Sequence, residues 1–315
     1  MRKSIKNMTC LFIVMVSLTL LNSCKKNKQE PSENLALSEP KTEKEVIESK
    51  SILSKEFNDY WYAGEAEITS YKLEQARYGE IRNGNAVLVF VTEDFLPNKQ
   101  VKADNYSKKN TPILKLNATK NFNTGIYPYS IMQSTFYPVV NNKHALKISA
   151  SVQEWCGHVY TQLNNRDDFE VMSHSYFESE GDQTFNVKKT WTENEIWTKL
   201  RINPSSLPIG EIEIIPSLEF TRLKHIDIKS YQATTALKDG IYTITYAALN
   251  RTLKINFNQE FPFDILGWEE TSISGYGPNS KTLTTKATKL ESIKSAYWNK
   301  NNNANEVLRE KLRLQ

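Results

Sequence analysis

Short β-rich runs follow one another at close spacing from residue 65 to residue 290, and this succession constrains the fold more than any other feature. The runs are rich in β-branched and aromatic residues, and turn-forming residues separate many of them. Because no helical pattern intervenes, the succession predicts an antiparallel all-β domain, built as a sandwich or as one strongly curved sheet. Strands are expected at residues 65–78, 86–91, 113–119, 125–136, 144–151, 154–163, 169–177, 184–190, 211–215, 225–231, 241–246, 252–257, 262–270 and 281–290.

Turns and two short helices complete the predicted fold. Typical turn pairs are Asn83-Gly84, Gly181-Asp182 and Asp239-Gly240. Residues 42–60 predict an amphipathic helix that packs on the domain, because apolar side chains share one face at Val46, Leu53, Phe57 and Tyr60. The alternative for this segment is a charged, partly ordered extension. Residues 306–314 predict a small terminal helix, so the expected fold class is mainly β with a short N-terminal and a short C-terminal helix.

The first residues have the pattern of an export signal. A basic start is followed by an apolar run from Cys10 to Leu21, which is too short for a comfortable membrane span. The run ends in Leu21-Asn22-Ser23-Cys24, which resembles a bacterial lipobox. The resemblance implies that the Cys24 thiolate receives a diacylglycerol and that cleavage occurs before this residue. The alternative is an ordinary cleaved signal in which Cys24 is incidental.

Charge and cysteine usage narrow the functional classes. The chain has 40 basic and 36 acidic side chains. Loss of Arg2, Lys3 and Lys6 with the signal leaves 37 against 36, so no basic stripe for nucleic acid is expected. Cys10 leaves with the signal and Cys24 carries lipid, which leaves Cys156 as the one remaining thiol. No intramolecular disulfide is therefore expected in the mature chain.

Trp155-Cys156-Gly157-His158 is the most distinctive tetrapeptide of the domain. On a strand, Cys156 and His158 would share one face and could hold a metal or exchange a proton. Two ligands do not complete a metal site, however, and a nucleophilic thiol needs a supporting cation or helix end. A thiol packed in the core is the favoured interpretation. No catalytic residue, metal site or cofactor is predicted.

Other polar and aromatic groups allow weaker hypotheses. Asp167-Asp168 is interpreted as a polar hairpin tip, with a cation site as the alternative. Glu269-Glu270 could form a glycosidase couple, but adjacent strand residues point to opposite faces, which argues against it. Aromatic side chains could line a groove for an apolar ligand, or they could be ordinary core; they are Tyr127, Tyr129, Phe136, Tyr137, Tyr242 and Tyr246.

Two resemblances concern the domain as a whole. From the run Trp61-Tyr62-Ala63-Gly64-Glu65-Ala66 to Phe261-Pro262-Phe263-Asp264-Ile265, the chain resembles an uncharacterised lipoprotein group of Bacteroidota, some of whose members carry the label of the septum formation inhibitor family. That label implies a small cytoplasmic α/β nucleotide pyrophosphatase. This chain is expected to be exported and β-rich, and it lacks the Ser/Arg phosphate-binding loop of that family. The activity is therefore not transferred.

The second resemblance is to envelope β-cups that carry lipids or lipoproteins. It covers residues 212–270. The similar part has strands that end in Arg251-Thr252-Leu253-Lys254-Ile255, followed by the pattern Pro-x-x-Ile-x-x-Trp-Glu. It implies a curved antiparallel sheet around an apolar cavity and supplies no site residues.

These observations predict four segments and a location. Residues 1–23 form the signal peptide, 24–41 a lipidated flexible tether, 42–60 the amphipathic helix and 61–315 the antiparallel β domain. Lys25 stands where an aspartate retains many lipoproteins at the inner membrane, so the outer membrane is expected. The basic residues after Cys24 differ from the acidic surface-export tags of Bacteroidota, which favours a body facing the periplasm over the cell surface.

The functional prediction is a non-enzymatic β domain of the cell envelope. It is held at the membrane through a lipid anchor and binds an apolar ligand or an envelope protein. An envelope hydrolase of unknown substrate is the alternative. A deep apolar cavity would favour binding, whereas a cleft with converging acids or a histidine would favour the enzyme.

Overall fold

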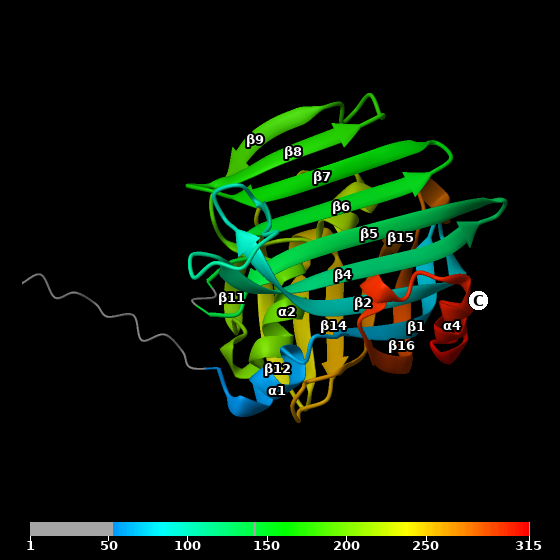
Figure 1. Ribbon diagram of the computed structural model, residues 1–315. Helices are drawn as coiled ribbons and strands as arrows, with labels where there is room; N and C mark the ends of the chain where they lie inside the picture. The colour runs from blue at the N-terminus through cyan, green and yellow to red at the C-terminus, as the bar shows by residue number, and fades with distance from the viewer. Residues whose placement is uncertain (1–52, 141–142, 315) are drawn as a thin grey trace, which may run out of the picture. The chain divides into compact units, whose positions relative to one another are not determined.

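The computed structural model describes residues 53–140 and 143–314, and in them one curved sheet dominates the fold (Figure 1). The predicted mainly β class is confirmed, and the structure contains a curved sheet where a sandwich was the alternative. All neighbouring strands are antiparallel except β10 and β11. The strands are β1 (Ala66–Arg77), β2 (Glu80–Leu96), β3 (Val101–Lys102), β4 (Thr111–Thr124), β5 (Tyr127–Pro138), β6 (Lys147–Glu154), β7 (Gly157–Asn165), β8 (Phe169–Ser175), β9 (Gln183–Val187), β10 (Trp191–Thr192), β11 (Gly210–Ile215), β12 (Tyr231–Lys238), β13 (Ile241–Tyr246), β14 (Arg251–Phe257), β15 (Ile265–Ser274) and β16 (Lys281–Ser295). The α-helices are α1 (Lys55–Trp61), α2 (Glu193–Ile202), α3 (Leu218–Lys224) and α4 (Val307–Lys311), and short 3₁₀ turns lie at Pro204–Ser206, Ala247–Leu249, Gly277–Asn279, Tyr297–Asn299 and Asn303–Glu306.

The chain enters this sheet in the middle and fills one half at a time. From β1 to β9 strands are added outward to one edge, with β3 as a short branch on β2. The chain then starts again at the opposite edge with β10 and returns to β16, which pairs with β1. Residues 188–190 alone connect β9 to β10, and four Cα steps span at most about 15 Å. The sheet is therefore rolled until its two edge strands come close, along a line called the seam below.

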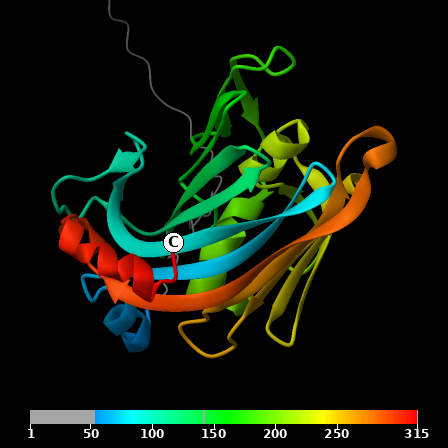
Figure 2. The ribbon, with the colours of Figure 1, turned by 90° about the vertical axis from the view of Figure 1, so that its right-hand side faces the viewer.

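Two helices lie on the inner face of the rolled sheet. α2 contacts β4 and β5, and α3 contacts β5 and β6; Figure 2 shows α2 between the strands of the two halves. Eight of the ten residues of α2 and five of the seven residues of α3 are buried. The prediction of strands without intervening helices is wrong at these two places. No helix among residues 53–140 and 143–314 is long and apolar enough to cross a membrane.

A complete capping box starts α2. The Thr192 hydroxyl accepts a hydrogen bond from the Glu195 backbone N–H, and the Glu195 carboxylate accepts one from the Thr192 N–H at 3.0 Å. The same carboxylate also accepts from the Ala145 backbone N–H at 2.6 Å and contacts the His144 ring at 3.1 Å. Glu195 therefore ties the start of α2 to the segment that leads into β6.

Two buried ion pairs hold α2 against the sheet. Arg201 donates to both carboxylate oxygens of Glu67 in β1, at 2.5 and 2.7 Å, and both side chains are at most 2 % exposed. At the other end of the helix, Glu193 accepts from both terminal guanidinium nitrogens of Arg251 in β14. Burial is the largest effect and opposes the ionisation of Glu67, but the Arg201 charge, the hydrogen bonds from Arg201 and Tyr60 and the Lys294 charge together outweigh it and lower the pKa of Glu67. Glu193 and Arg201 point inward because their partners lie in the sheet.

The predicted N-terminal helix is seen only at its end. The first part of the predicted range, residues 42–52, lies outside the described residues. Within them, α1 starts after Ser54, whose hydroxyl accepts from the Phe57 N–H at 3.1 Å. Phe57 and Trp61 are buried in the main core, so the expected packing on the domain is confirmed for this part. The C-terminal helix is also found, as α4.

Two local predictions are wrong for identifiable reasons. Asn83-Gly84 lies inside β2, and the turn between β1 and β2 is Tyr78-Gly79, where both residues have a positive φ. Gly84 is needed because a Cβ there would stand 2.2 Å from the Asn121 carbonyl oxygen of β4. The strand expected at 225–231 is instead the end of α3 and a loop, because His225 adopts the left-handed conformation that ends the helix.

Replacing Gly84 with alanine is expected to lower the free energy of unfolding by about 1–3 kcal/mol, because the new methyl group would force β2 and β4 apart. Gly157→Ala is the matched control: like Gly84, Gly157 lies on a strand without a positive φ, but its Cβ would meet side-chain atoms of the exposed Tyr176 at 3.1 and 3.2 Å and not a strand backbone, so a smaller loss is expected. Urea denaturation measures the free energy of unfolding of both variants. Equal losses would show that the close approach of β2 and β4 is not what requires Gly84.

Candidate functional site

Five hairpins that are neighbours in the sheet end at one rim and expose large apolar side chains there. They are β15–β16, β1–β2, β4–β5, β6–β7 and β8–β9. The tips of β4–β5 and β6–β7 project at the right of Figure 1. The exposed side chains are Tyr276 (64 %), Tyr78 (38 %), Ile126 (84 %), Trp155 (68 %) and Tyr176 (81 %). With the partly buried Tyr127, these residues are called the aromatic rim.

Ring contacts connect most of the aromatic rim. The rings of Tyr276 and Tyr78 lie 6.4 Å apart, and the Tyr78 and Tyr129 hydroxyls share a hydrogen bond of 2.8 Å. Tyr127 continues the series, with ring centroids 5.9 Å from Tyr129 and 6.2 Å from Trp155. Buried Tyr129 therefore bridges exposed rings from hairpins that are far apart in the sequence.

A buried arginine fixes the middle of the rim. The Arg77 guanidinium donates to the Tyr78 and Tyr129 hydroxyls at 3.0 and 3.2 Å, and its carbon lies 4.2 Å from the centre of the Tyr78 ring. Burial, followed by the hydrogen bond with Tyr129, raises the pKa of Tyr78. Tyr78 is thus held in one orientation although its ring is partly exposed.

At the far end of the rim, Gly157 makes room for the Tyr176 side chain. A Cβ on Gly157 would stand 3.1 Å from the Tyr176 ring and 3.4 Å from the Phe177 ring. Any larger residue would push these rings away from the tip of β6–β7. The glycine therefore lets the tips of β6–β7 and β8–β9 meet.

The tips that carry the rim are mainly acidic. Residues 78–80, 125–127, 154–157, 176–182 and 275–281 contain five acidic residues and one lysine. Three of the acids are paired: Glu80 contacts Arg82 at 2.5 Å, Glu180 contacts Arg222 at 3.1 Å and Asp182 contacts His174 at 3.2 Å. Glu178 is exposed at the same tip. Aromatic side chains surrounded by carboxylates are suited to a partner with a basic surface.

The sequence singled out Trp155, Cys156 and His158, and the structure places them at the tip of β6–β7. Glu154 pairs with Gly157, so Trp155 and Cys156 form the turn itself and do not lie on a strand. Cys156 is exposed, and the prediction that it packs in the core is therefore wrong. The Glu154 carboxylate accepts from the Cys156 backbone N–H at 2.7 Å and raises the pKa of the thiol. A raised thiol pKa opposes a nucleophilic role, whereas Trp155 belongs to the aromatic rim.

Cys156 is expected to react with iodoacetamide in the folded protein, because the thiol is exposed. Glu154→Gln should speed the reaction near neutral pH, since loss of the carboxylate lowers the thiol pKa and increases the thiolate fraction. His158→Ala should leave the rate unchanged. The measurement is the rate of alkylation by mass spectrometry. A reaction that requires unfolding, or one slowed by loss of His158, would contradict this prediction.

Tyr127 was named as a possible groove residue, but the other rim residues, Tyr78, Ile126, Tyr176 and Tyr276, were missed from the sequence, although a signal is present. An aromatic or aliphatic residue stands beside a glycine at the tips of β1–β2, β4–β5 and β15–β16, in Tyr78-Gly79, Gly125-Ile126-Tyr127 and Gly275-Tyr276-Gly277. Glycine supplies the positive φ of each turn. The neighbouring side chain is then left at the outermost point of the hairpin.

The interior between the helices and the sheet holds little free space at its centre. A cavity of about 40 Å³ is lined by residues that include Lys120, Trp197, Glu219, Trp268 and Glu270. Both carboxylate oxygens of Glu219 are used, by Lys120 at 2.8 Å and by Gln133 at 2.9 Å. Burial raises the pKa of Glu219, whereas Arg251 and Lys120 lower that of Glu270 against the effect of its burial. A cavity of this size holds about three water molecules.

The structure also shows where the residues of the predicted aromatic groove and of the acid pair Glu269-Glu270 lie. Tyr129, Tyr137, Tyr242 and Tyr246 are buried in the hydrophobic core, so the interpretation as ordinary core is confirmed for them. Glu270 points inward to Arg251, while Glu269 points outward to Lys286. Their opposite directions confirm the argument against a glycosidase couple. No group of three metal-ligating side chains occurs in the part of the chain that the structure describes.

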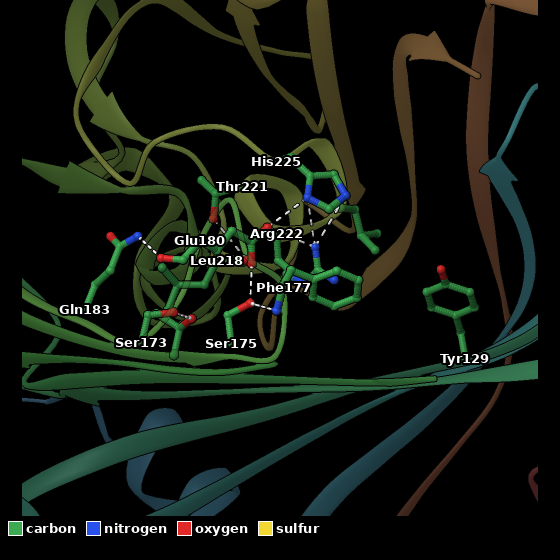
Figure 3. Close-up of polar contacts among 12 residues, drawn as sticks. Tyr129, Ser173, Ser175, Phe177, Glu180, Gln183, Leu218, Thr221, Arg222 and His225 are labelled. Carbon is green, nitrogen blue, oxygen red and sulfur yellow. Dashed lines mark hydrogen bonds and ion pairs between the residues drawn. The ribbon is translucent and has the colours of Figure 1, made fainter. Parts of the chain in front are cut away.

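A larger cavity of about 160 Å³ lies at the seam, between β7–β9 and the segment from Thr221 to Ile228. It is called the seam cavity. Figure 3 shows Glu180, Arg222 and His225 meeting on one side of it. The Glu180 carboxylate contacts the Arg222 Nη1 at 3.1 Å and the His225 ring at 2.8 Å. The Arg222 guanidinium carbon lies 4.3 Å from the centre of the Phe177 ring.

This cluster does not have the geometry of a hydrolase triad. The Ser175 hydroxyl donates to Glu180 at 2.6 Å, and Glu180 in turn contacts His225. The carboxylate thus stands between the hydroxyl and the imidazole. A serine nucleophile requires the imidazole to contact the hydroxyl directly, with the acid behind it.

Comparison with known proteins gives one structural neighbour. No family model matches this chain, and no curated protein matches it. A crystal structure described as a β-barrel-like protein of a domain of unknown function, DUF1849, from Brucella abortus is similar, with a TM-score of 0.36 and 7 % identity. The similarity covers 73 % of this chain and 97 % of that one. The resemblances to a Bacteroidota lipoprotein group and to envelope β-cups stay predictions.

Proposed function

We propose that this chain is a cell-envelope lipoprotein whose β domain is a non-enzymatic binding module, and that the aromatic rim binds a protein partner with a basic surface. One observation carries this proposal: five neighbouring hairpins each expose a large apolar side chain at the same rim. Single exposed hydrophobic residues are ordinary on protein surfaces, whereas a connected group marks an interaction site.

The residue types favour a protein as the partner. Trp and Tyr supply rigid contact area at low entropic cost and dominate the binding energy of protein interfaces. The surrounding glycine, serine and asparagine residues add adaptable polar contacts, as in the turn 275–280. The excess of carboxylates at the tips then selects a basic surface and accelerates association.

The interior argues against transport of an apolar ligand. Pockets for drug-sized ligands usually enclose roughly 300–1,000 Å³. The cavity beside Trp197 and Trp268 has about 40 Å³ and is lined by three carboxylates, from Glu193, Glu219 and Glu270. The helices α2 and α3 occupy the place that a lipid would take in a β-cup. Binding at the surface is therefore the better-supported form of the binding role.

Cys24 anchors the module in this proposal, and the tether of residues 24–41 lets it reach its partner. Radiolabelled palmitate should enter the wild-type protein and not Cys24→Ala. Fractionation should place the wild type in the outer membrane, with the domain protected from protease added outside intact cells. Equal labelling of wild type and variant would contradict lipid attachment at Cys24. It would not bear on the proposal that the aromatic rim binds a partner.

Site-specific photo-crosslinking in living cells tests the rim. A benzophenone amino acid at position 176 is expected to give a discrete adduct whose crosslinked peptide is rich in Lys and Arg. The control position is Ile209, which is 58 % exposed and precedes β11 at the end of that strand away from the rim. Absence of an adduct from every tip, or equal adducts from position 209, would contradict the proposal.

A further inference from the structure

We infer that the seam cavity is a second binding site, for a small molecule that joins a carboxylate to a compact apolar group. The cavity encloses about 160 Å³. An engineered apolar cavity of about 150 Å³ accommodates benzene, so one ring or one branched aliphatic group fits this volume. The site adjoins the β8–β9 tip of the aromatic rim through Glu180, but it does not depend on the function proposed for the rim.

One side of the seam cavity is apolar. Val159 and Phe185 line it from the sheet, and Ile226 and Ile228 line it from the loop after α3. The hydroxyls of Thr161 and Ser173 also line it, but they bond to each other at 2.9 Å and so present little unsatisfied polarity. This wall suits the apolar part of a ligand.

The opposite side carries an arginine with an unused donor. The Arg222 side chain is 8 % exposed, and its Nε is buried without a hydrogen-bond partner among the described residues. An unpaired buried N–H is costly, so a ligand that accepts from it gains more than an ordinary hydrogen bond. Nη1 is already held by Glu180, which leaves the edge formed by Nε and Nη2. A carboxylate matches such an edge with two parallel hydrogen bonds.

The surroundings fix this arginine and keep the site open to an anion. Phe177 covers one face of the guanidinium at 4.3 Å, and Glu180 fixes its direction. Both acids that line the cavity are neutralised by cations: Glu180 by Arg222, and Asp227 by Lys229 at 2.9 Å. Repulsion of a third carboxylate is therefore weak.

Calorimetric titration of the detergent-solubilised full-length protein tests the site with phenylacetate and with phenylacetamide, its neutral isostere. Phenylacetate is expected to bind about ten- to a hundredfold more tightly, as charge-assisted hydrogen bonds allow. A short peptide that ends in phenylalanine is titrated as a third ligand. Binding of the peptide as well would identify the C-terminus of a polypeptide as the source of the carboxylate, and binding of the free acid alone would identify a small metabolite.

Two variants complete the test. Arg222→Gln should remove the preference for phenylacetate over phenylacetamide, whereas Arg166→Gln, a control outside the cavity, should retain it. Ile228→Trp should block both compounds by filling the cavity while Arg222 remains in place. Circular dichroism establishes that each variant is folded. Equal binding of acid and amide to the wild type, binding unaffected by Arg222→Gln, or no binding at millimolar concentrations would overturn the inference.

Discussion

Arg201→Met is expected to lower the free energy of unfolding by about 3–5 kcal/mol, because it leaves the Glu67 carboxylate buried without its cation. In the wild type, Glu67 is 2 % exposed, and Arg201 holds both of its oxygens. The Tyr60 hydroxyl also donates to Glu67 at 2.5 Å, so the same pair fastens α1 and α2 to β1.

Urea unfolding of three variants separates the charge from the packing. Arg201→Met/Glu67→Leu should lose much less stability than Arg201→Met alone, because no unpaired charge remains. Arg313→Met is the matched control: it also breaks an ion pair with a glutamate, but the Arg313 side chain is 65 % exposed and the pair contributes about 0–1 kcal/mol. If Arg201→Met is as stable as Arg313→Met, the Arg201–Glu67 pair does not hold the helices.

The pH dependence of this pair has a definite sign. Arg201 lowers the pKa of Glu67 below 4.5, so the folded protein keeps the pair ionised at a pH where the unfolded chain is already protonated. Its contribution to stability is therefore complete above 4.5 and is lost as the pH falls below that value. In Arg201→Met the dependence should reverse, because acid then neutralises a buried charge that has lost the cation bound to it.

The second large effect concerns the aromatic rim. Trp155→Ser/Tyr176→Ser is expected to weaken binding of the crosslinked partner by at least a hundredfold, because aromatic side chains that anchor an interface each contribute about 2 kcal/mol or more. Both residues are at least 68 % exposed in the domain alone, so their loss should leave its stability almost unchanged. Surface plasmon resonance of the purified pair measures this change in affinity.

The charge of the tips should act mainly on the association rate. Glu178→Lys is expected to slow association and to reduce its dependence on salt, because it removes attraction for a basic surface. Ile209→Ser, remote from the rim, is the control for loss of an exposed apolar residue. An affinity that survives the double substitution at Trp155 and Tyr176 would place the interface elsewhere.

The sequence predicted the succession of strands well, because each strand carries its own local pattern. The runs that became β4 to β9, β13 and β14 alternate or are β-branched, and turn residues separate them. The Asn83-Gly84 pair was misleading, because glycine can serve a close approach of strands as well as a turn. The residues next to such a glycine do not show whether it forms a turn or allows a close approach of strands.

The inner helices were missed because their stabilising partners are far away in the sequence. A local signal for α2 was present, since Thr192 and Glu195 have capping-box spacing and Ile196 and Leu200 stand four residues apart, but nothing near its charged residues shows that they are buried. Arg201 meets Glu67 across 134 positions and Glu193 meets Arg251 across 58. The rim has the same origin, since sheet register alone brings Tyr78 and Tyr276 together. The sequence contains these residues, but it does not show that they lie close together in the fold.

Hydrogen–deuterium exchange of the protein in isolated envelopes, compared with the purified protein, tests the central claim most directly. Protection is expected at the tips near Tyr78, Ile126, Trp155, Tyr176 and Tyr276, and it should disappear in Trp155→Ser/Tyr176→Ser. The amides of α2 and α3 should exchange alike in both samples. Protection confined to those two helices, or exchange at the tips that is unchanged by the envelope, would contradict binding through the aromatic rim.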